Sequence, residues 1–131
     1  MNRIFEDLFV LEMANNHWGK LERGLKIISD YGKVVRFNNV RAALKFQFRD
    51  VDNIVHAGFK GRTDIRYVKK TMDTKLSEEN YQILVKAAVE NGLIPMATPF
   101  DEASVDMCER LNIPIIKIAS YDINDWLLIE K

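Results

Sequence analysis

Four short apolar runs along the chain each lead into a polar residue. They are residues 9–11 before Glu12, residues 42–44 before Lys45, residues 93–97 before Thr98 and residues 115–119 before Ser120. Apolar runs of this length favour buried strands, and the stretches between them have the spacing of amphipathic helices. Strands that alternate with helices form a parallel sheet with right-handed crossovers. The pattern therefore predicts an α/β fold built on parallel strands.

Capping residues mark the helices between these strands. We expect a first helix over residues 18–37, which Asn39 ends because asparagine tolerates the left-handed conformation. Ser77 is a favourable N-cap for a second helix, and Gly92 ends it. Asp101 caps a third helix, and a further helix is expected to start at residue 124 or 125.

The stretch over residues 49–75 is longer than the other connections and has no clear periodicity. It carries seven lysines and arginines against four aspartates. A connection of this length is typical of a functional lid, and a basic lid above the strand ends could close over an anionic substrate. A solvated loop that contains a short helix is the alternative.

Composition narrows the class of protein. With 131 residues the chain is one domain, and 47% hydrophobic with 29% charged residues is ordinary for a soluble protein. Because 19 basic residues balance 19 acidic ones, a nucleic-acid-binding surface is not expected.

The amino terminus lacks a signal-peptide core and no run is long enough to span a membrane, so we expect a cytoplasmic protein. Cys108 is expected to be a buried thiol, and the distant His17 and His56 form no metal site.

The polar residues after the apolar runs are the candidate functional residues. Carboxyl ends of parallel strands converge on one mouth, where active sites form. Two lysines and two hydroxyls suit a phosphorylated or otherwise anionic substrate, and a carboxylate could orient or deprotonate a reacting group. The residues expected to meet there are Glu12, Lys45, Gln47, Thr98, Lys117 and Ser120.

Lys117 stands out because it interrupts an apolar run. A lysine at this position would point into a buried layer, where an unpaired ammonium costs several kcal/mol. It therefore requires a reason such as a phosphate, a carboxylate or a Schiff base, and a structural salt bridge to Glu12 or a helix acid is the alternative. Glu12 is likewise expected to be shielded from water, with an ion pair to a lysine as its alternative role. Thr98 could merely lead into the helix that Asp101 caps.

Four motifs in this order resemble the N-acetylneuraminate (sialic acid) synthase family. The resemblance covers nearly the whole chain, but only the amino-terminal half of that family's TIM barrel. It implies that residues 1–131 form about the first four βα units, a half-barrel. The motifs are Glu12 with Asn16-His17-Trp18-Gly19, Lys45-Phe46-Gln47, Thr98-Pro99-Phe100, and Lys117-Ile118-Ala119-Ser120.

The resemblance implies an enzyme that condenses phosphoenolpyruvate with an N-acylated amino sugar such as N-acetylmannosamine and releases phosphate. By this resemblance Lys45 and Lys117 neutralise the anionic groups of phosphoenolpyruvate, Lys117 being catalytic. Thr98 and Ser120 would add hydrogen bonds to the same groups. Gln47 and the catalytic Glu12 would face the sugar, with Glu12 near the reacting aldehyde.

Three departures from the family pattern affect what the chain can do. The family's divalent metal, manganese or magnesium, is held by residues of later strands that this chain does not contain. A carboxyl-terminal antifreeze-like domain that completes the family's site across a dimer is also absent. Tyr121 stands where the family usually has glycine. We therefore expect residues 1–131 alone to be inactive and to function as part of a longer chain.

Two other functional classes stay open at this point. One is a non-catalytic half-barrel that binds anions or partners, and the other is an aldolase or Schiff-base enzyme with Lys117 as nucleophile. Metal dependence would separate the latter from the synthase. We also expect a homo-oligomer, because the unpaired edges at residues 9–11 and 115–116 would seek a partner. A monomer whose terminal segments fold over these edges is the alternative.

Overall fold

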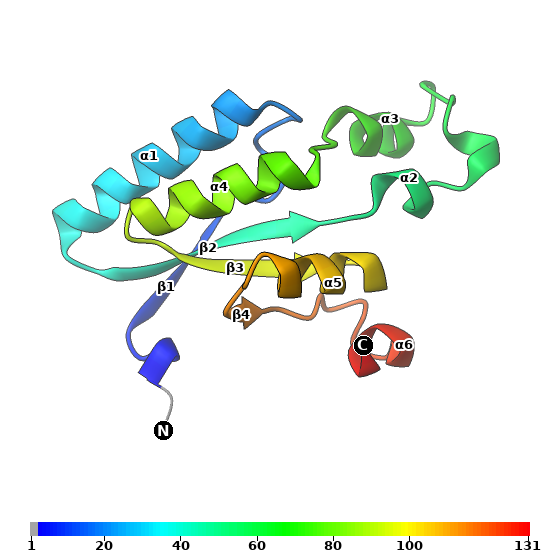
Figure 1. Ribbon diagram of the computed structural model, residues 1–131. Helices are drawn as coiled ribbons and strands as arrows, with labels where there is room; N and C mark the ends of the chain where they lie inside the picture. Colours follow the sequence, from blue (N-terminus) through cyan, green and yellow to red (C-terminus); the bar gives the residue numbers. More distant parts are fainter. Residues whose placement is uncertain (1–2) are drawn as a thin grey trace.

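A computed structural model describes residues 3–131 of the chain (Figure 1). Parallel strands alternate with helices. Three short helical segments occupy the long connection that follows the second strand. The strands are β1 (Leu8–Glu12), β2 (Arg41–Phe48), β3 (Ile94–Pro99) and β4 (Ile115–Ile116). The helices are η1 (Arg3–Phe5), α1 (Leu21–Asn38), α2 (Val51–Ile54), η2 (Ala57–Phe59), α3 (Arg66–Asp73), α4 (Glu78–Glu90), α5 (Glu102–Arg110) and α6 (Trp126–Glu130).

The described strands form one parallel sheet in the order β1-β2-β3-β4. The predicted parallel α/β fold is therefore confirmed. In Figure 1, α1 and α4 lie side by side over the sheet, and α5 packs against β3. The fourth strand is shorter than expected, since only Ile115 and Ile116 pair with β3.

The core lies between the sheet and its helices. Alternate residues of β2, Leu44, Phe46 and Phe48, are fully buried and pack with Ile28 of α1 and Leu84 of α4. Cys108 of α5 is also part of this core, and burial raises the pKa of its thiol to about 11. A thiol in this environment is a packing residue, as the sequence predicted.

Most helix ends follow the predicted caps. The side chain of Ser77 accepts a hydrogen bond from the Asn80 amide at 3.2 Å, and Asp101 accepts one from the Ser104 amide at 2.7 Å. Asn39 has the left-handed conformation after α1, with φ of 49°. The expected start of this helix at Trp18 is wrong. Trp18 and Gly19 have φ of 53° and 68°, which no α-helix accommodates, so the helix begins at Leu21.

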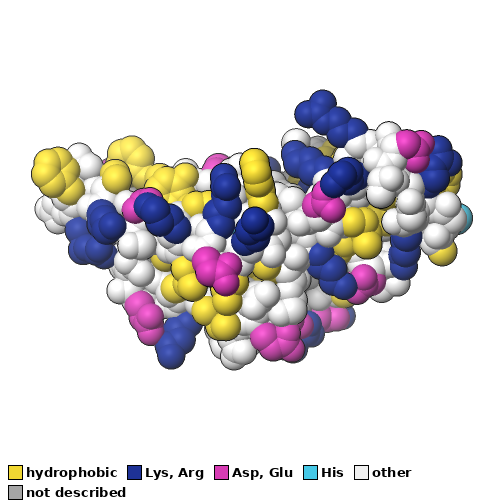
Figure 2. Space-filling model, turned by 90° about the horizontal axis from the view of Figure 1, so that it is seen from above, with side chains coloured by type: hydrophobic (Ala, Val, Ile, Leu, Met, Phe, Trp, Pro, Cys, Tyr) yellow, Lys and Arg dark blue, Asp and Glu magenta, His cyan; other side chains and the backbone are white. Residues whose placement is uncertain are grey.

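The connection over residues 49–75 contains α2, η2 and α3, so it does include short helices. These segments stand at the end of the molecule toward which β2 and β3 run (Figure 1). Figure 2 shows lysine and arginine side chains spread over the whole face in view, this end included, interspersed with acidic ones. No helix within residues 3–131 is long and apolar enough to cross a membrane.

Gly19 joins the loop after β1 to the carboxyl end of α3. A Cβ atom at this position would lie 2.6 Å from the carbonyl oxygen of Asp73 and 3.2 Å from that of Lys75. Backbone atoms cannot yield as a flexible side chain could, and the positive φ of Gly19 disfavours any other residue. This contact therefore holds the basic connection beside the mouth of the sheet.

We predict that Gly19→Ala lowers the free energy of unfolding of the intact protein by about 2 kcal/mol or more, because it adds a left-handed strain and a backbone clash. Urea denaturation at pH 7 measures the change. Gly61→Ala is the matched control, since no atom lies within 4 Å of the added Cβ. Equal stability of the two variants would contradict the assigned role of Gly19.

Candidate active site

Strand register brings the predicted residues of β1, β2 and β3 onto one face of the sheet. Glu12 is the partner of Lys45, and Gln47 is the partner of Thr98. Side chains alternate along a strand, so Lys45 and Gln47 point away from the core that Leu44 and Phe46 enter. Four residues far apart in the sequence therefore share the carboxyl ends of three neighbouring strands.

Glu12 and Lys45 form an ion pair across β1 and β2. Nζ of Lys45 lies 2.5 Å from Oε1 of Glu12. The Lys45 side chain is only 9% exposed, so it needs this counter-charge, whereas the Glu12 side chain is 53% exposed. The expectation that Glu12 is shielded from water is thus wrong, while its ion pair with a lysine is present. An exposed carboxylate edge remains available to a ligand.

Thr98 presents an unused hydrogen-bonding group beside Gln47. The Thr98 residue is 2% exposed, and its hydroxyl has no hydrogen-bond partner among the described residues. Gln47 is held from the other side, where its Oε1 accepts a hydrogen bond from Nδ2 of Asn15 at 3.2 Å. Buried hydroxyls without partners are rare because each costs free energy, so Thr98 is suited to meet a ligand atom.

Lys117 does not lie in a buried layer, contrary to the sequence-based expectation. It is exposed, and Ile118 beside it is 50% exposed. The physical reason is that β4 pairs with β3 along one edge, and no described strand pairs with its other edge. The Lys117 amide still donates to the Ala97 carbonyl at 2.9 Å, which keeps the lysine next to Thr98 on the neighbouring strand. Ser120 follows in the exposed turn and makes no side-chain hydrogen bond within residues 3–131.

Asp122 is a site residue that the sequence-based interpretation missed. It is 6% exposed, and its Oδ2 has no hydrogen-bond partner among the described residues. Burial, followed by the nearby Asp125 charge, raises the pKa of this carboxyl group, and Arg49 opposes the shift. The sequence offered one indication of this residue, since Asp122 comes only two residues after the predicted site residue Ser120.

Arg49, Phe100 and Tyr121 surround the same mouth. The Arg49 guanidinium lies 4.2 Å from the centre of the Phe100 ring, which stacks on Tyr121 at a centroid distance of 5.8 Å. Tyr121 therefore fills the corner where the sequence motif departs from the glycine of the family it resembles. A bulky ring here reshapes the mouth without blocking the strand ends, because Tyr121 is mostly exposed.

His17 has a structural role in the loop after β1. It is fully buried, its Nδ1 accepts a hydrogen bond from the Gly19 amide at 3.0 Å, and its ring packs edge-on against Tyr81. Burial lowers the pKa of His17 to about 4. The imidazole is therefore neutral at physiological pH and supports the turn that Gly19 completes.

The residues described here do not make a metal site. Across residues 3–131 there is no group of three or more histidine, cysteine, aspartate and glutamate side chains that could hold a metal ion. Glu12 is engaged by Lys45, and Nε2 of His17, which has no hydrogen-bond partner among the described residues, belongs to no such group. A divalent metal thus does not fit on this part of the chain alone.

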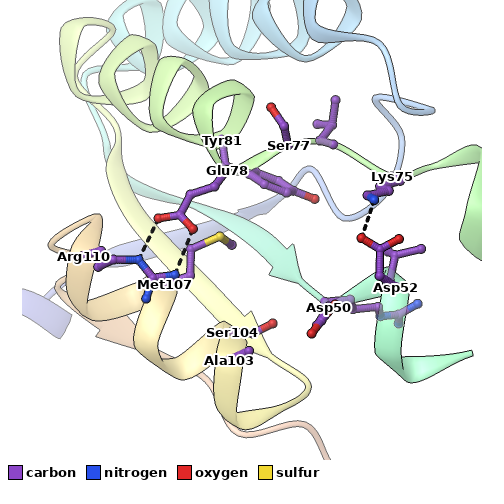
Figure 3. Close-up of a pocket in the computed structure, with 13 residues that line it drawn as sticks. Asp50, Asp52, Lys75, Ser77, Glu78, Tyr81, Ala103, Ser104, Met107 and Arg110 are labelled. Carbon is purple, nitrogen blue, oxygen red and sulfur yellow. Dashed lines mark hydrogen bonds and ion pairs between the residues drawn. The ribbon is translucent and has the colours of Figure 1, made fainter.

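A separate cavity of about 360 Å³ lies between α4 and α5 (Figure 3). Four of its charged groups pair with one another: Arg110 forms two bonds of 2.8 Å with Glu78, and Lys75 lies 2.6 Å from Asp52. Arg49 and Asp50 also line this cavity, but none of the predicted site residues does, so it is not the candidate active site.

Comparison with protein families decides the classification. The profile of the NeuB family matches residues 38–131, a span that contains Lys45, Gln47, Thr98, Lys117 and Ser120. The chain belongs to the NeuB family. The human N-acetylneuraminate-9-phosphate synthase is 25% identical to this NeuB-family chain over 127 residues, which cover 93% of the chain and 34% of that protein.

Solved structures agree with this membership. Spore coat polysaccharide biosynthesis protein E from Chromobacterium violaceum is 42% identical, with a TM-score of 0.89 over 95% of this chain and 37% of that one. The N-acetylneuraminic acid (sialic acid) synthetase from Leptospira borgpetersenii shares the fold, with a TM-score of 0.75 and 23% identity over 95% of this chain and 39% of that one. The NeuB-family chain spans about a third of the length of the curated relatives it matches.

We predict that the stability of the intact protein falls by about 1–2 kcal/mol between pH 7 and pH 5 through His17 alone. Its pKa is near 6.5 when unfolded and about 4 when folded, so the unfolded state binds more protons in this window and stability rises with pH. Urea denaturation at both pH values should show a smaller pH dependence for His17→Asn than for the wild type. The exposed His56→Asn is the control, and an unchanged dependence in His17→Asn would contradict this role.

Proposed function

We propose that this NeuB-family chain is part of an enzyme that condenses phosphoenolpyruvate with an N-acylated amino sugar and releases phosphate. The observation that carries the proposal is that one face of the sheet holds both a buried lysine, Lys45, and a buried hydroxyl without a hydrogen-bond partner, that of Thr98. Lys117 adds a second cation beside Thr98. Positive charge and free donors at the strand ends suit the phosphate and carboxylate of phosphoenolpyruvate.

In the proposed reaction the enol carbon of phosphoenolpyruvate attacks the aldehyde carbon of the open-chain sugar. The new carbon–carbon bond leaves an oxocarbenium cation at the carbon that carries the phosphate ester. Water adds to this cation and its proton goes to the alkoxide that the aldehyde oxygen has become. The resulting tetrahedral intermediate then loses its hydroxyl proton, expels phosphate and becomes a ketone. Lys45 and Lys117 would hold the anions in place throughout, which lowers the barrier by fixing the two substrates in reacting positions.

Two carboxyl groups are available for proton transfer. Glu12 is half-exposed beside Lys45 and could contact the aldehyde oxygen or sugar hydroxyls, with Gln47 as a neighbouring donor. Asp122 is buried, its Oδ2 has no hydrogen-bond partner among the described residues, and burial raises its pKa, so it could accept or return a proton. We propose that Asp122 accepts the proton that the attacking water releases, on its way to the alkoxide.

A divalent metal, manganese or magnesium, is part of the proposal only through the family resemblance. In synthases of this kind the ion would polarise the aldehyde as a Lewis acid. The described residues offer no ligand set for it, so its ligands would come from outside this chain, and none of the steps above is assigned to it.

We further propose that the sheet is the first half of a closed TIM barrel. The strands follow one another in sequence order, as in a barrel wall. Phe9 and Val10 of β1 and Ile116 of β4 leave large apolar side chains exposed at the two edges. The remaining strands would cover these edges in the relatives, which are about three times as long. Whether the protein is a homo-oligomer stays a prediction.

The alternative in which Lys117 forms a Schiff base is less well supported. Lysines that act as nucleophiles are usually activated by desolvation or by a second cation, and Lys117 is exposed on this chain. A non-catalytic binding module would also use the anion site, but it would not require the buried proton-transfer group that Asp122 supplies.

We predict that Lys45→Ala and Lys117→Ala each weaken phosphoenolpyruvate binding to the intact protein by about tenfold or more, the value of one charge-assisted hydrogen bond. Isothermal titration calorimetry measures the dissociation constants. Lys86→Ala is the control, because it removes the same charge from the exposed face of α4. Undiminished binding in both variants of the proposed site would refute the anion site.

We predict that Asp122→Asn lowers kcat by about a hundredfold and leaves phosphoenolpyruvate affinity within threefold, because it removes proton transfer and not charge neutralisation. Steady-state kinetics measure kcat, and calorimetry measures the phosphoenolpyruvate affinity. A variant with wild-type kcat would exclude Asp122 from the chemistry.

A further inference from the structure

A second cavity, of about 320 Å³, opens beside Gln47 under the basic connection. It lies between the loop after β1 and α3, on the side of Gln47 away from Thr98. None of its lining residues is acidic, although aspartates and glutamates are as numerous in the chain as lysines and arginines. The lining residues are Ala14, Asn15, Asn16, Trp18, Gln47, Arg49, Tyr67, Lys70, Thr71 and Thr74.

Arg49 supplies the first cation of this cavity. It follows Lys45 and Gln47 at two-residue spacing, so it continues their face one step outward from the proposed substrate site. Its guanidinium carbon lies over the Phe100 ring, 4.2 Å from the ring centre, a cation–π contact that restrains the side chain. Its Nε is buried and has no hydrogen-bond partner among the described residues. Arg49 lines the cavity and makes no ion pair within residues 3–131, so its positive charge is available to an oxyanion.

Lys70 supplies the second cation, from α3. Its neighbour Lys69 is bound to Asp73, and Lys75 is bound to Asp52. Lys70 makes no ion pair within residues 3–131 and lines the cavity directly. The contact between Gly19 and the carboxyl end of α3 holds this helix in place, so the two cations are presented by elements fixed relative to each other.

We propose that this cavity is a second oxyanion site, which binds a phosphate or carboxylate group through Arg49 and Lys70 while phosphoenolpyruvate occupies the strand ends. The proposal rests on the proposed function for the location of phosphoenolpyruvate. Two cations without an opposing carboxylate attract an anion, and amide and hydroxyl groups of the lining can complete its hydrogen bonds. The volume exceeds that of one phosphate, so it admits an anion attached to a sugar-sized group. The anion is either carried by the amino-sugar substrate or is a free small ion.

The test is a calorimetric titration of inorganic phosphate into the intact protein with and without saturating phosphoenolpyruvate. Phosphate should still bind when phosphoenolpyruvate is saturating, and Lys70→Ala should raise its dissociation constant about tenfold. Arg49→Lys should weaken binding as well, because it keeps the charge but loses the planar fork. Lys70 is exposed on α3, so its substitution preserves the fold even if a change at Arg49 does not.

Lys69→Ala is the matched control. It removes the same charge from the adjacent position of α3, but Lys69 does not line this cavity. Loss of phosphate binding in the presence of phosphoenolpyruvate would overturn the proposal, as would equal weakening in Lys69→Ala and Lys70→Ala. Phosphoenolpyruvate affinity is measured in the same samples, so absence of that binding would count against the proposed function, while phosphate titrated alone still reports on Arg49 and Lys70.

Steady-state kinetics then distinguish the two sources of the anion. If the amino sugar carries it, Lys70→Ala should raise KM for a phosphorylated N-acylated amino sugar about tenfold and leave KM for the uncharged sugar unchanged. If the anion is a free ion, neither KM changes while the phosphate dissociation constant still rises. Either result supports the oxyanion site.

Discussion

The parallel register of β1, β2 and β3 is the constraint on which the rest of the structure depends. It sets Glu12 opposite Lys45 and Gln47 opposite Thr98, and it places Leu44 and Phe46 in the core on the other face. A slip of one residue would turn the lysine into the core and a leucine into the mouth. The apolar contacts with α1 and α4 that oppose such a slip therefore also assemble the polar site.

The polar side of the sheet contains groups that the fold itself does not satisfy. The Thr98 hydroxyl, Nε of Arg49 and Oδ2 of Asp122 are all buried without a hydrogen-bond partner among the described residues. Nε2 of His17 is unpaired as well, and each such atom costs free energy. Thr98 lies in β3, Arg49 directly follows β2, and Asp122 follows β4, so all three come from the carboxyl-terminal side of the sheet.

The sequence predicted the strands, the parallel sheet and the caps at Ser77 and Asp101, because apolar runs and capping chemistry act locally. It could not predict that Lys117 and Glu12 are exposed, since burial of a strand depends on neighbours that only the three-dimensional arrangement reveals. Arg49 and Asp122 were missed because their importance lies in unsatisfied buried atoms, which leave no mark on periodicity. The early helix start failed at Trp18 and Gly19, where positive φ angles serve the contact with α3.

The most direct test of the account is a crystal structure of the intact protein with phosphoenolpyruvate. The account predicts that the ligand lies at the carboxyl ends of the strands, with its anionic groups within hydrogen-bond distance of Lys45, Lys117 and the Thr98 hydroxyl. Phosphoenolpyruvate bound away from these residues, for example in the cavity between α4 and α5, would contradict it.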